Sequence, residues 1–144
     1  MLSKKTKYAI KALVFIARNK DEQPLSASRI SEEQNIPLKF LEAILTELKN
    51  ARILNSRKGK YGGYSLNGAP EEIRMAQIMR LLDGPISILP CVSLNFYERC
   101  EECVDEARCG IRQIALEIRD ETVERLEAAT LVDIIRREKN LKGR

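Results

Sequence analysis

Between residues 25 and 66, the spacing of apolar positions predicts two short helices joined by a tight turn. Apolar residues form a short face before Asn35 and recur at helical spacing after it. Asn35 tolerates the left-handed conformation that ends a helix, and Pro37 suits the start of the next one because its missing N–H would be unpaired there. The pattern is typical of a helix-turn-helix. Its apolar positions are Ala27, Ile30, Ile36, Leu41, Ile44, Leu45 and Leu48.

The second helix of this pair has an outer face if its apolar residues point into the core. In a helix-turn-helix, residues near the start of that helix meet the edges of DNA bases. We therefore expect a reading surface on this face. It consists of Lys39, Phe40, Glu42, Ala43 and Thr46.

A basic hairpin follows, with strands expected over 53–57 and 63–66 and glycines that permit a tight connection. Every charged residue from Lys49 to Gly68 is basic. A ribbon of one charge beside a reading helix suits phosphates or a narrow minor groove, so we expect a DNA-binding wing, with a merely solvated hairpin as the alternative. The candidate DNA contacts of the wing are Arg57, Lys58, Lys60, Gly62, Gly63 and Tyr64.

Helices are also predicted on both sides of this unit. Residues 4–18 are apolar around most of a helical circumference, which predicts a core helix. A helix over 71–82 is expected to end at Asp83-Gly84-Pro85. A long helix is expected over 110–129. A last short helix, capped by Thr130, is expected over 131–135 and is followed by a solvated basic tail from Arg136 to Arg144.

The expected fold is mainly α, a winged helix-turn-helix with a two-stranded wing and a long C-terminal dimerisation helix. Three parts are predicted: a DNA-binding domain at 1–83, a cysteine-rich sensor loop at 84–109, and the dimerisation and C-terminal helices at 110–144. The long helix has an apolar stripe that we expect to pack against a second subunit, with an intramolecular cover for the core as the alternative. The expected interface residues are Ile111, Ile114, Ala115, Ile118, Thr122 and Leu126.

Composition narrows the class of protein. With 144 residues and 44% hydrophobic content, the chain can bury one core but cannot add a large catalytic domain. The net charge of +4 is modest, and basic residues concentrate in the first twenty positions and the wing. Histidine is absent, which argues against an enzyme because the commonest general base is missing. No apolar run approaches the roughly 20 residues of a membrane span, so a cytoplasmic location is expected.

All four cysteines lie in one segment, as Cys91, Cys100, Cys103 and Cys109. Soft thiolates suit zinc or an iron-sulfur cluster, and the spacing lacks the paired CxxC of zinc ribbons, which favours iron-sulfur. Two alternatives are small buried hydrophobes and a thiol-disulfide switch. The acids around the cysteines tend to raise thiol pKa values, so a bare switch ranks below a cluster.

These pieces together resemble the Rrf-two (Rrf2) family of bacterial transcriptional regulators over nearly the whole chain. The Gly62-Gly63-Tyr64 run is the most specific match, and Cys91 followed by Cys103-x5-Cys109 resembles the family's three-cysteine cluster motif. Other matching stretches are Lys7-Tyr8-Ala9-Ile10, Ile30-Ser31-Glu32, Leu41-Glu42 and Thr130-Leu131-Val132-Asp133-Ile134.

The resemblance implies a homodimeric winged-helix repressor or activator, with repression favoured, that holds a [2Fe-2S] or [4Fe-4S] cluster in the cysteine loop. It places Pro37, Lys39, Phe40, Glu42 and Ala43 on the reading helix, and Lys58 at the wing position that enters the minor groove. Some relatives carry a histidine after the third cysteine, and others use an acid near the start of the first helix, where this chain has Lys7. Cys100 is therefore the expected fourth ligand.

Two partners are expected. One is double-stranded DNA with a pseudo-palindromic site, and the other is a second copy of the chain. Two other classes of function remain alternatives. A small redox protein would use the cluster but leave the helix-turn-helix unused, and a partner-binding module would use the long helix and acidic loop.

Overall fold

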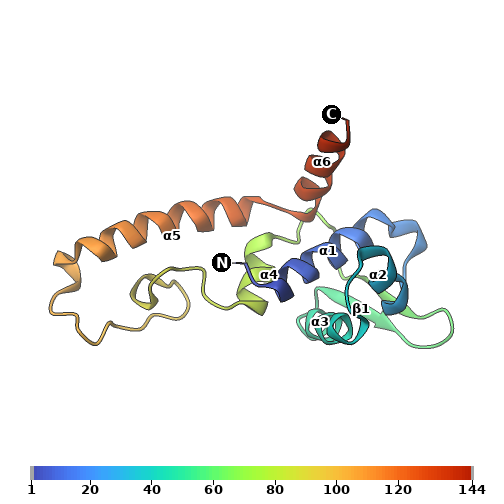
Figure 1. The fold of residues 1–144 in the computed structure, drawn as a ribbon, viewed down its shortest axis with the longest axis horizontal. Helices are drawn as coiled ribbons and strands as arrows, with labels where there is room; N and C mark the ends of the chain where they lie inside the picture. The colour runs from blue at the N-terminus through green and yellow to red at the C-terminus, as the bar shows by residue number, and fades with distance from the viewer. Residues whose placement is uncertain (1, 144) are drawn as a thin grey trace.

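The N-terminal helix α1 (Lys4–Arg18) forms the centre of the core, as its apolar circumference predicts. Ala9, Ala12, Leu13 and Ile16 on it are fully buried. Helices α2, α3, α4 and α6 all pack against α1. The computed structural model describes residues 2–143 of the chain, and Figure 1 shows α1 surrounded by these elements.

The helix-turn-helix has the predicted architecture, with α2 at Ala27–Gln34 and α3 at Leu38–Asn50. Asn35 adopts the left-handed conformation with φ of 52° and ends α2. Pro37 is the N-cap of α3, one position before the helix begins, and was expected to start the helix itself. The four residues predicted to face inward from α3 are all buried, namely Leu41, Ile44, Leu45 and Leu48.

The wing is an antiparallel pair of strands, β1 (Leu54–Arg57) and β2 (Gly63–Leu66), in which Leu54 pairs with Leu66. Ile53, expected to open the first strand, is buried just before β1. The backbone of Tyr64 also exchanges two hydrogen bonds with Leu25, at 2.9 and 2.8 Å. These bonds fix the wing to the segment that enters α2.

Helix α4 (Met75–Leu82) begins later than predicted, because residues 73 and 74 are extended and pair with a distant segment. Arg74 forms an isolated antiparallel bridge with Thr130, and the Leu131 N–H donates to the Ile73 carbonyl at 3.1 Å. The predicted helix over 71–82 is therefore wrong at its N-terminal end. Gly84, with φ of 89°, follows the helix at the expected stop.

The last helix, α6 (Leu131–Lys142), is longer than predicted, so the tail from Arg136 is helical as far as Lys142. Thr130 and Asp133 form a capping box at its start. Leu131 is buried in the main core, and an ion pair joins Glu138 to Arg18 of α1. These contacts explain the extra length, and Arg144 lies outside the described residues.

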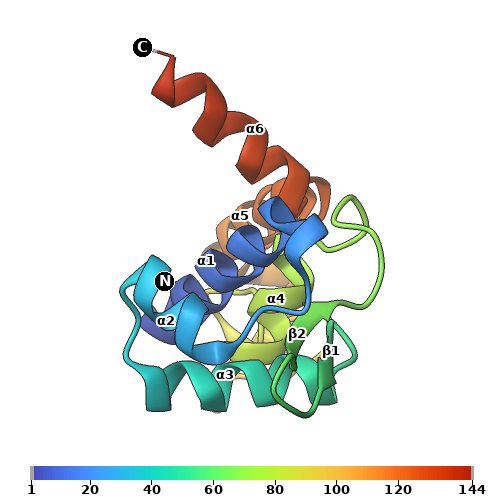
Figure 2. The same cartoon turned by 90° about the vertical axis from the view of Figure 1, so that its right-hand side faces the viewer.

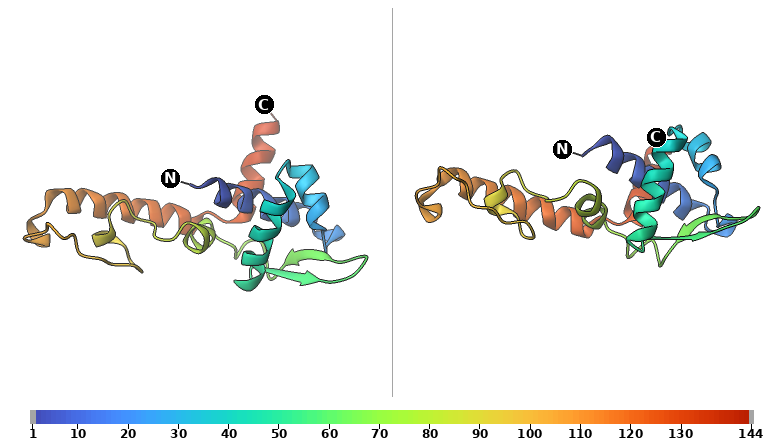
Figure 3. Two further views of the ribbon diagram at one scale, coloured as in Figure 1. Left: turned by 60° about the horizontal axis from the view of Figure 1, so that its bottom comes forward. Right: turned by 90° about the horizontal axis from the view of Figure 1, so that it is seen from below.

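Helix α5 (Gly110–Ala128) extends away from the winged-helix body. Figures 1 and 3 show that the chain after α4 runs outward along this helix and returns through it, so the cysteine loop lies at the end of α5 far from the wing. The connecting segments of the described chain contain short single-turn helices, namely η1 (Lys20–Glu22), η2 (Pro90–Val92) and η3 (Glu106–Arg108). No described helix combines the length and apolar character that crossing a bilayer requires.

Candidate nucleic-acid interface and cysteine cavity

The predicted reading face of α3 is exposed. Figure 2 shows α3 along the lower side of the body with the wing beside it. The six residues predicted for this surface are all exposed, namely Pro37, Lys39, Phe40, Glu42, Ala43 and Thr46.

Two of these side chains also have contacts within the protein. The Thr46 hydroxyl donates to the Glu42 carbonyl at 2.8 Å, so it is already engaged along its own helix. The Phe40 ring meets the Tyr8 ring edge-on, with centroids 5.6 Å apart, and this contact joins α3 to α1. Lys39 and the Glu42 carboxylate form no ion pair within residues 2–143.

The glycines of the wing permit a close backbone approach. Gly63 has φ of +148°, and a Cβ at this position would lie 2.3 Å from the Leu25 carbonyl oxygen. A Cβ on Gly62 would lie 2.1 Å from the Arg57 carbonyl oxygen. Tyr64 is half-buried and packs against the core. These three residues therefore shape the wing, whatever contact with DNA they also make.

The basic side chains of the wing have no acidic partner among residues 2–143. Arg57, Lys58 and Lys60 are exposed, and no ion pair in the described part of the chain involves them or Lys39. Tyr61 at the tip is 81% exposed, and the Lys60 ammonium lies 5.6 Å from its ring centroid. Tyr61 did not stand out in the sequence, although an aromatic residue between two wing glycines was a usable signal.

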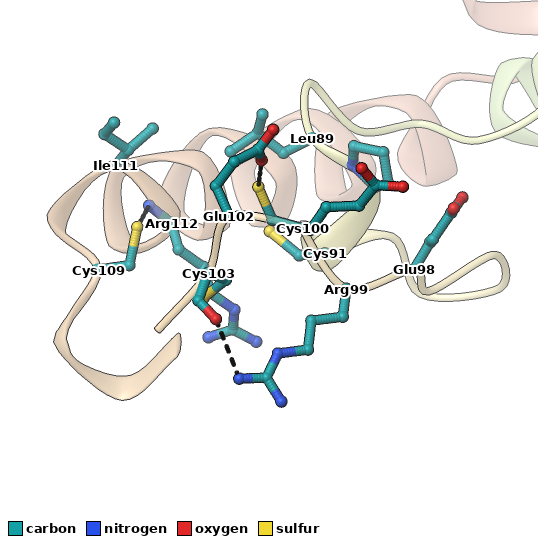
Figure 4. A pocket seen from close by; sticks show the side chains of 12 residues that line it. Leu89, Cys91, Glu98, Arg99, Cys100, Glu102, Cys103, Cys109, Ile111 and Arg112 are labelled. Atoms are coloured by element: carbon teal, nitrogen blue, oxygen red, sulfur yellow. Dashed lines mark hydrogen bonds between the residues drawn. The ribbon is translucent and has the colours of Figure 1, made fainter. Parts of the chain in front are cut away.

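The cysteine segment forms a second site, remote from the first. All four cysteines line one cavity of about 510 Å³, together with Arg99 and Arg112 (Figure 4). Their exposure differs, since Cys91 is buried, Cys100 is exposed, and Cys103 and Cys109 are intermediate. Within residues 2–143, no three ligand side chains are grouped as they would be around one metal ion.

Two of the cysteines are tied to α5. Cys91 packs with Val92 and Ala115 in a small core of its own, so Ala115 of the predicted dimer stripe is turned inward. Cys109 is the N-cap of α5, and its sulfur accepts a hydrogen bond from the Arg112 N–H at 3.4 Å. Two of the four thiols are thus attached to the helix that leads back to the DNA-binding body.

The acids of the loop act on its polar groups. The Cys100 thiol donates to the Glu102 carboxylate at 3.1 Å, which raises the pKa of Cys100 and lowers that of Glu102. A reactive thiol requires the opposite shift. The Tyr97 hydroxyl donates to Glu106, which raises the pKa of Tyr97. Arg99 donates to the Cys103 carbonyl at 3.2 Å and so holds the loop together.

The predicted dimer stripe is divided between two environments. Ile111, Ile114 and Ile118 are 72%, 61% and 43% exposed, whereas Ala115 is buried. Thr122 and Leu126 are intermediate. The exposed isoleucines form an apolar edge on α5 that nothing in the described chain covers.

Helices α2 and α3 with the β1–β2 wing define a DNA-binding winged helix-turn-helix protein. The model of the Rrf2 family, described as an iron-dependent transcriptional regulator, matches residues 2–137. The chain therefore belongs to the Rrf2 family, whose members are transcriptional regulators and not enzymes.

Similarity to individual proteins extends over the same range. An rrf2-like HTH-type transcriptional regulator of Rhodobacter capsulatus is 38% identical over 138 residues, covering 94% of this chain and 92% of that protein. The structure of CymR (YrzC), the global cysteine regulator of B. subtilis, is similar with a TM-score of 0.76 and 31% identity, covering 93% of this chain and 95% of that chain. T. potens IscR, at 23% identity and a TM-score of 0.75, shares the fold over 96% of this chain and 88% of that chain.

Proposed function

We propose that the protein regulates transcription by binding duplex DNA as a homodimer, through the outer face of α3 and the wing. The observation that carries this proposal is the acid-free wing beside the exposed face of α3. Because Arg57, Lys58 and Lys60 have no acidic partner within residues 2–143, phosphate oxygens are the acceptors they fit best. Lys58 is assigned to the minor groove, and Lys39 and Glu42 to base edges.

The homodimer is proposed from the apolar edge of α5. Ile111, Ile114 and Ile118 follow helical spacing and stay exposed in the single chain, so burying them against a second α5 removes a large apolar area from water. Two copies of the reading unit then face the DNA together. The expected operator is a pseudo-palindrome with half-sites about one helical turn apart, at roughly 34 Å.

The cysteine cavity is proposed as the site of an iron-sulfur cluster. Four soft thiols surround one cavity of about 510 Å³, and this donor set suits a cluster. The spacing of the cysteines lacks the paired CxxC of zinc ribbons, which favours a cluster over a single zinc ion. Cys91, Cys100, Cys103 and Cys109 would hold the cluster, which supplies one-electron redox chemistry when bound.

The chain's own residues provide the connection between this cavity and the DNA-binding body. Cys109 caps α5, and Cys91 packs against Ala115, six residues further along the chain in the same helix. Any shift of these thiols is transmitted to α5, which contacts α4 at its other end. The coupling between the two sites is expected to be about 1–3 kcal/mol, as for other allosteric proteins.

Regulation by cysteine chemistry without a cluster is the second candidate. It is favoured by the similarity to CymR of Staphylococcus aureus, which has a solved structure of an oxidized form. In this mechanism the exposed Cys100 is the accessible thiol of the loop, although its hydrogen bond to Glu102 raises its pKa and so counts against its reactivity. The two candidates share the DNA-binding surface and differ only in what the cysteine loop holds.

Two measurements on anaerobically purified protein test these proposals. Selection from random genomic fragments is expected to enrich one pseudo-palindromic site, and recovery of unrelated fragments would contradict DNA-sequence recognition. Iron, sulfide and zinc analysis, with ultraviolet-visible and Mössbauer spectra, is expected to show a cluster. Colourless protein without iron or sulfide would leave the thiol-based candidate, and one zinc per subunit would replace the cluster.

A variant identifies the fourth ligand. Cys100→Ser is expected to lower the iron retained by the protein without reducing its secondary structure, because Cys100 is exposed and contributes nothing to the core. Unchanged iron and an unchanged spectrum in this variant would show that another residue completes the ligand set.

A further inference from the structure

Arg112 occupies an unusual position in the cysteine cavity. It lies in the first turn of α5 and lines the cavity together with the four cysteines (Figure 4). Its backbone N–H donates to the Cys109 sulfur. Its side-chain Nε is buried, and within residues 2–143 it is the single buried side-chain nitrogen or oxygen without a hydrogen-bond partner.

A buried guanidinium N–H without an acceptor is unfavourable, because it loses its hydrogen bonds to water and gains nothing in return. An arginine cannot relieve this cost by releasing its proton, since its pKa is too high. The cost is removed only when an acceptor, preferably an anionic one, enters the cavity. Arg112 therefore indicates what kind of group the cavity accepts.

Two other arginines near the cavity, Arg99 and Arg119, each have backbone carbonyls as hydrogen-bond acceptors. Arg99 donates to the carbonyls of Cys103 and Val104, and Arg119 donates to the Val92 carbonyl at 2.7 Å. Arg119 thereby joins the loop to α5, and Arg99 joins two parts of the loop to each other. Arg112 lies between these two contacts in the sequence and has no such acceptor for Nε among the described residues.

We infer that Arg112 donates a hydrogen bond from Nε to a sulfur of the cluster and is its positive counter-charge. This inference rests on the proposed cluster site. Four cysteine thiolates leave a cluster with net negative charge, and a guanidinium whose buried Nε–H has no partner among residues 2–143 offsets that charge at short range. Hydrogen bonds to cluster sulfurs favour the more reduced, more negative state, so Arg112 also raises the reduction potential.

The experiment compares Arg112→Met with two reference variants. Arg108→Met removes the same charge four residues earlier, but Arg108 is 89% exposed, pairs with Asp105 and does not line the cavity. Arg112→Lys keeps the charge and loses the fixed Nε–H. Each protein is prepared anaerobically, with iron and sulfide counted. Loss of iron to a chelator, the reduction potential and the melting temperature with and without iron are then measured.

The expected result is that Arg112→Met loses iron roughly tenfold faster or more, as is usual when an outer hydrogen-bond partner of a metal site is removed. Its reduction potential falls, Arg112→Lys lies between it and the wild type, and Arg108→Met matches the wild type. In iron-free protein Arg112→Met melts at a higher temperature than the wild type, because the unpaired N–H is gone. A purely packing role for the arginine stem would lower the melting temperature in both forms.

Three outcomes would overturn the inference. If the wild type carries a cluster and Arg112→Met matches Arg108→Met in iron loss and potential, the inference about Arg112 fails and the cluster site stands. If the wild type binds no iron or sulfide, both fail together. If Arg112→Lys matches the wild type in iron loss and reduction potential, charge alone is at work and the hydrogen bond from Nε is wrong.

Discussion

Glu127 near the end of α5 accepts a hydrogen bond from the guanidinium of Arg80 on α4. Arg74, which precedes α4, lies 3.5 Å from the same carboxylate. This pair of contacts fastens the long helix to the DNA-binding body at the end opposite the cysteine loop. The hydrogen bond from Arg80 is the main cause of a lowered pKa for Glu127.

Glu127→Gln is expected to destabilise the fold by about 1 kcal/mol or less at pH 7, since the carboxylate is 35% exposed and solvent weakens the pair. The lowered pKa means that the stabilisation is complete above the ordinary glutamate pKa of about 4.3 and is lost as pH falls through the lower value of the folded state. Urea unfolding from pH 7 to pH 3 should therefore show a weaker acid dependence in the variant. Identical pH profiles for the two proteins would contradict this assignment.

Gly63→Ala tests the contact between the wing and Leu25. The positive φ and the 2.3 Å approach to the Leu25 carbonyl predict a loss of roughly 2 kcal/mol or more. Gly59→Ala is the matched control, because Gly59 also has positive φ but has nothing within 4 Å of the added Cβ. Urea unfolding should show the larger loss for Gly63, with faster amide exchange at Leu25 and Tyr64. A larger loss at Gly59 would contradict the prediction.

Lys58→Ala is expected to weaken binding to all DNA sequences similarly and to reduce the slope of log affinity against log salt by about 1. The reason is the loss of one phosphate contact from the wing. Lys139→Ala provides the control, since Lys139 is an exposed lysine on α6, away from the wing. DNA titrations at several salt concentrations measure the affinity and the salt slope of each variant. A changed sequence preference at constant slope would assign Lys58 to base reading instead.

Ile114→Glu is expected to convert the dimer to monomers, because it places a charge at the centre of the exposed apolar edge of α5. Gln113→Glu adds the same charge at the neighbouring exposed position, outside the apolar stripe, and should leave the dimer intact. Sedimentation or light scattering gives the molar mass. Monomers should also bind a single half-site more weakly than the dimer binds a full operator. A dimeric Ile114→Glu protein would show that another surface joins the subunits.

Local signals predicted the DNA-binding unit well. Asn35 marks the turn, the buried residues of α3 follow helical spacing, and the glycines locate the wing. The start of α4 was not predictable from neighbouring residues, because the pairing of Arg74 with Thr130 joins segments far apart in the sequence. The length of α6 has the same kind of cause, since the ion pair with Arg18 comes from the other end of the chain.

The cysteine cavity was predictable only in outline. Clustering of the four thiols in one segment is visible in the sequence and places them together. The inward position of Ala115 depends on its packing with Cys91 and Val92, which spacing along α5 does not reveal. The unpaired Nε of Arg112 is a property of three-dimensional packing, and a charged residue at a helix start gives no sign of it.

Because α5 is long, a small rotation at one end of the helix gives a large displacement at the other end. Its 19 residues, at about 1.5 Å each, form a rod about 28 Å long. A rotation of roughly 10° at the Ala129 end would sweep the Cys109 end through about 5 Å. Conversely, a displacement of an ångström or two among the thiols corresponds to only a few degrees at the body. Pairing two such rods would turn that small angle into a change in the distance between two reading helices.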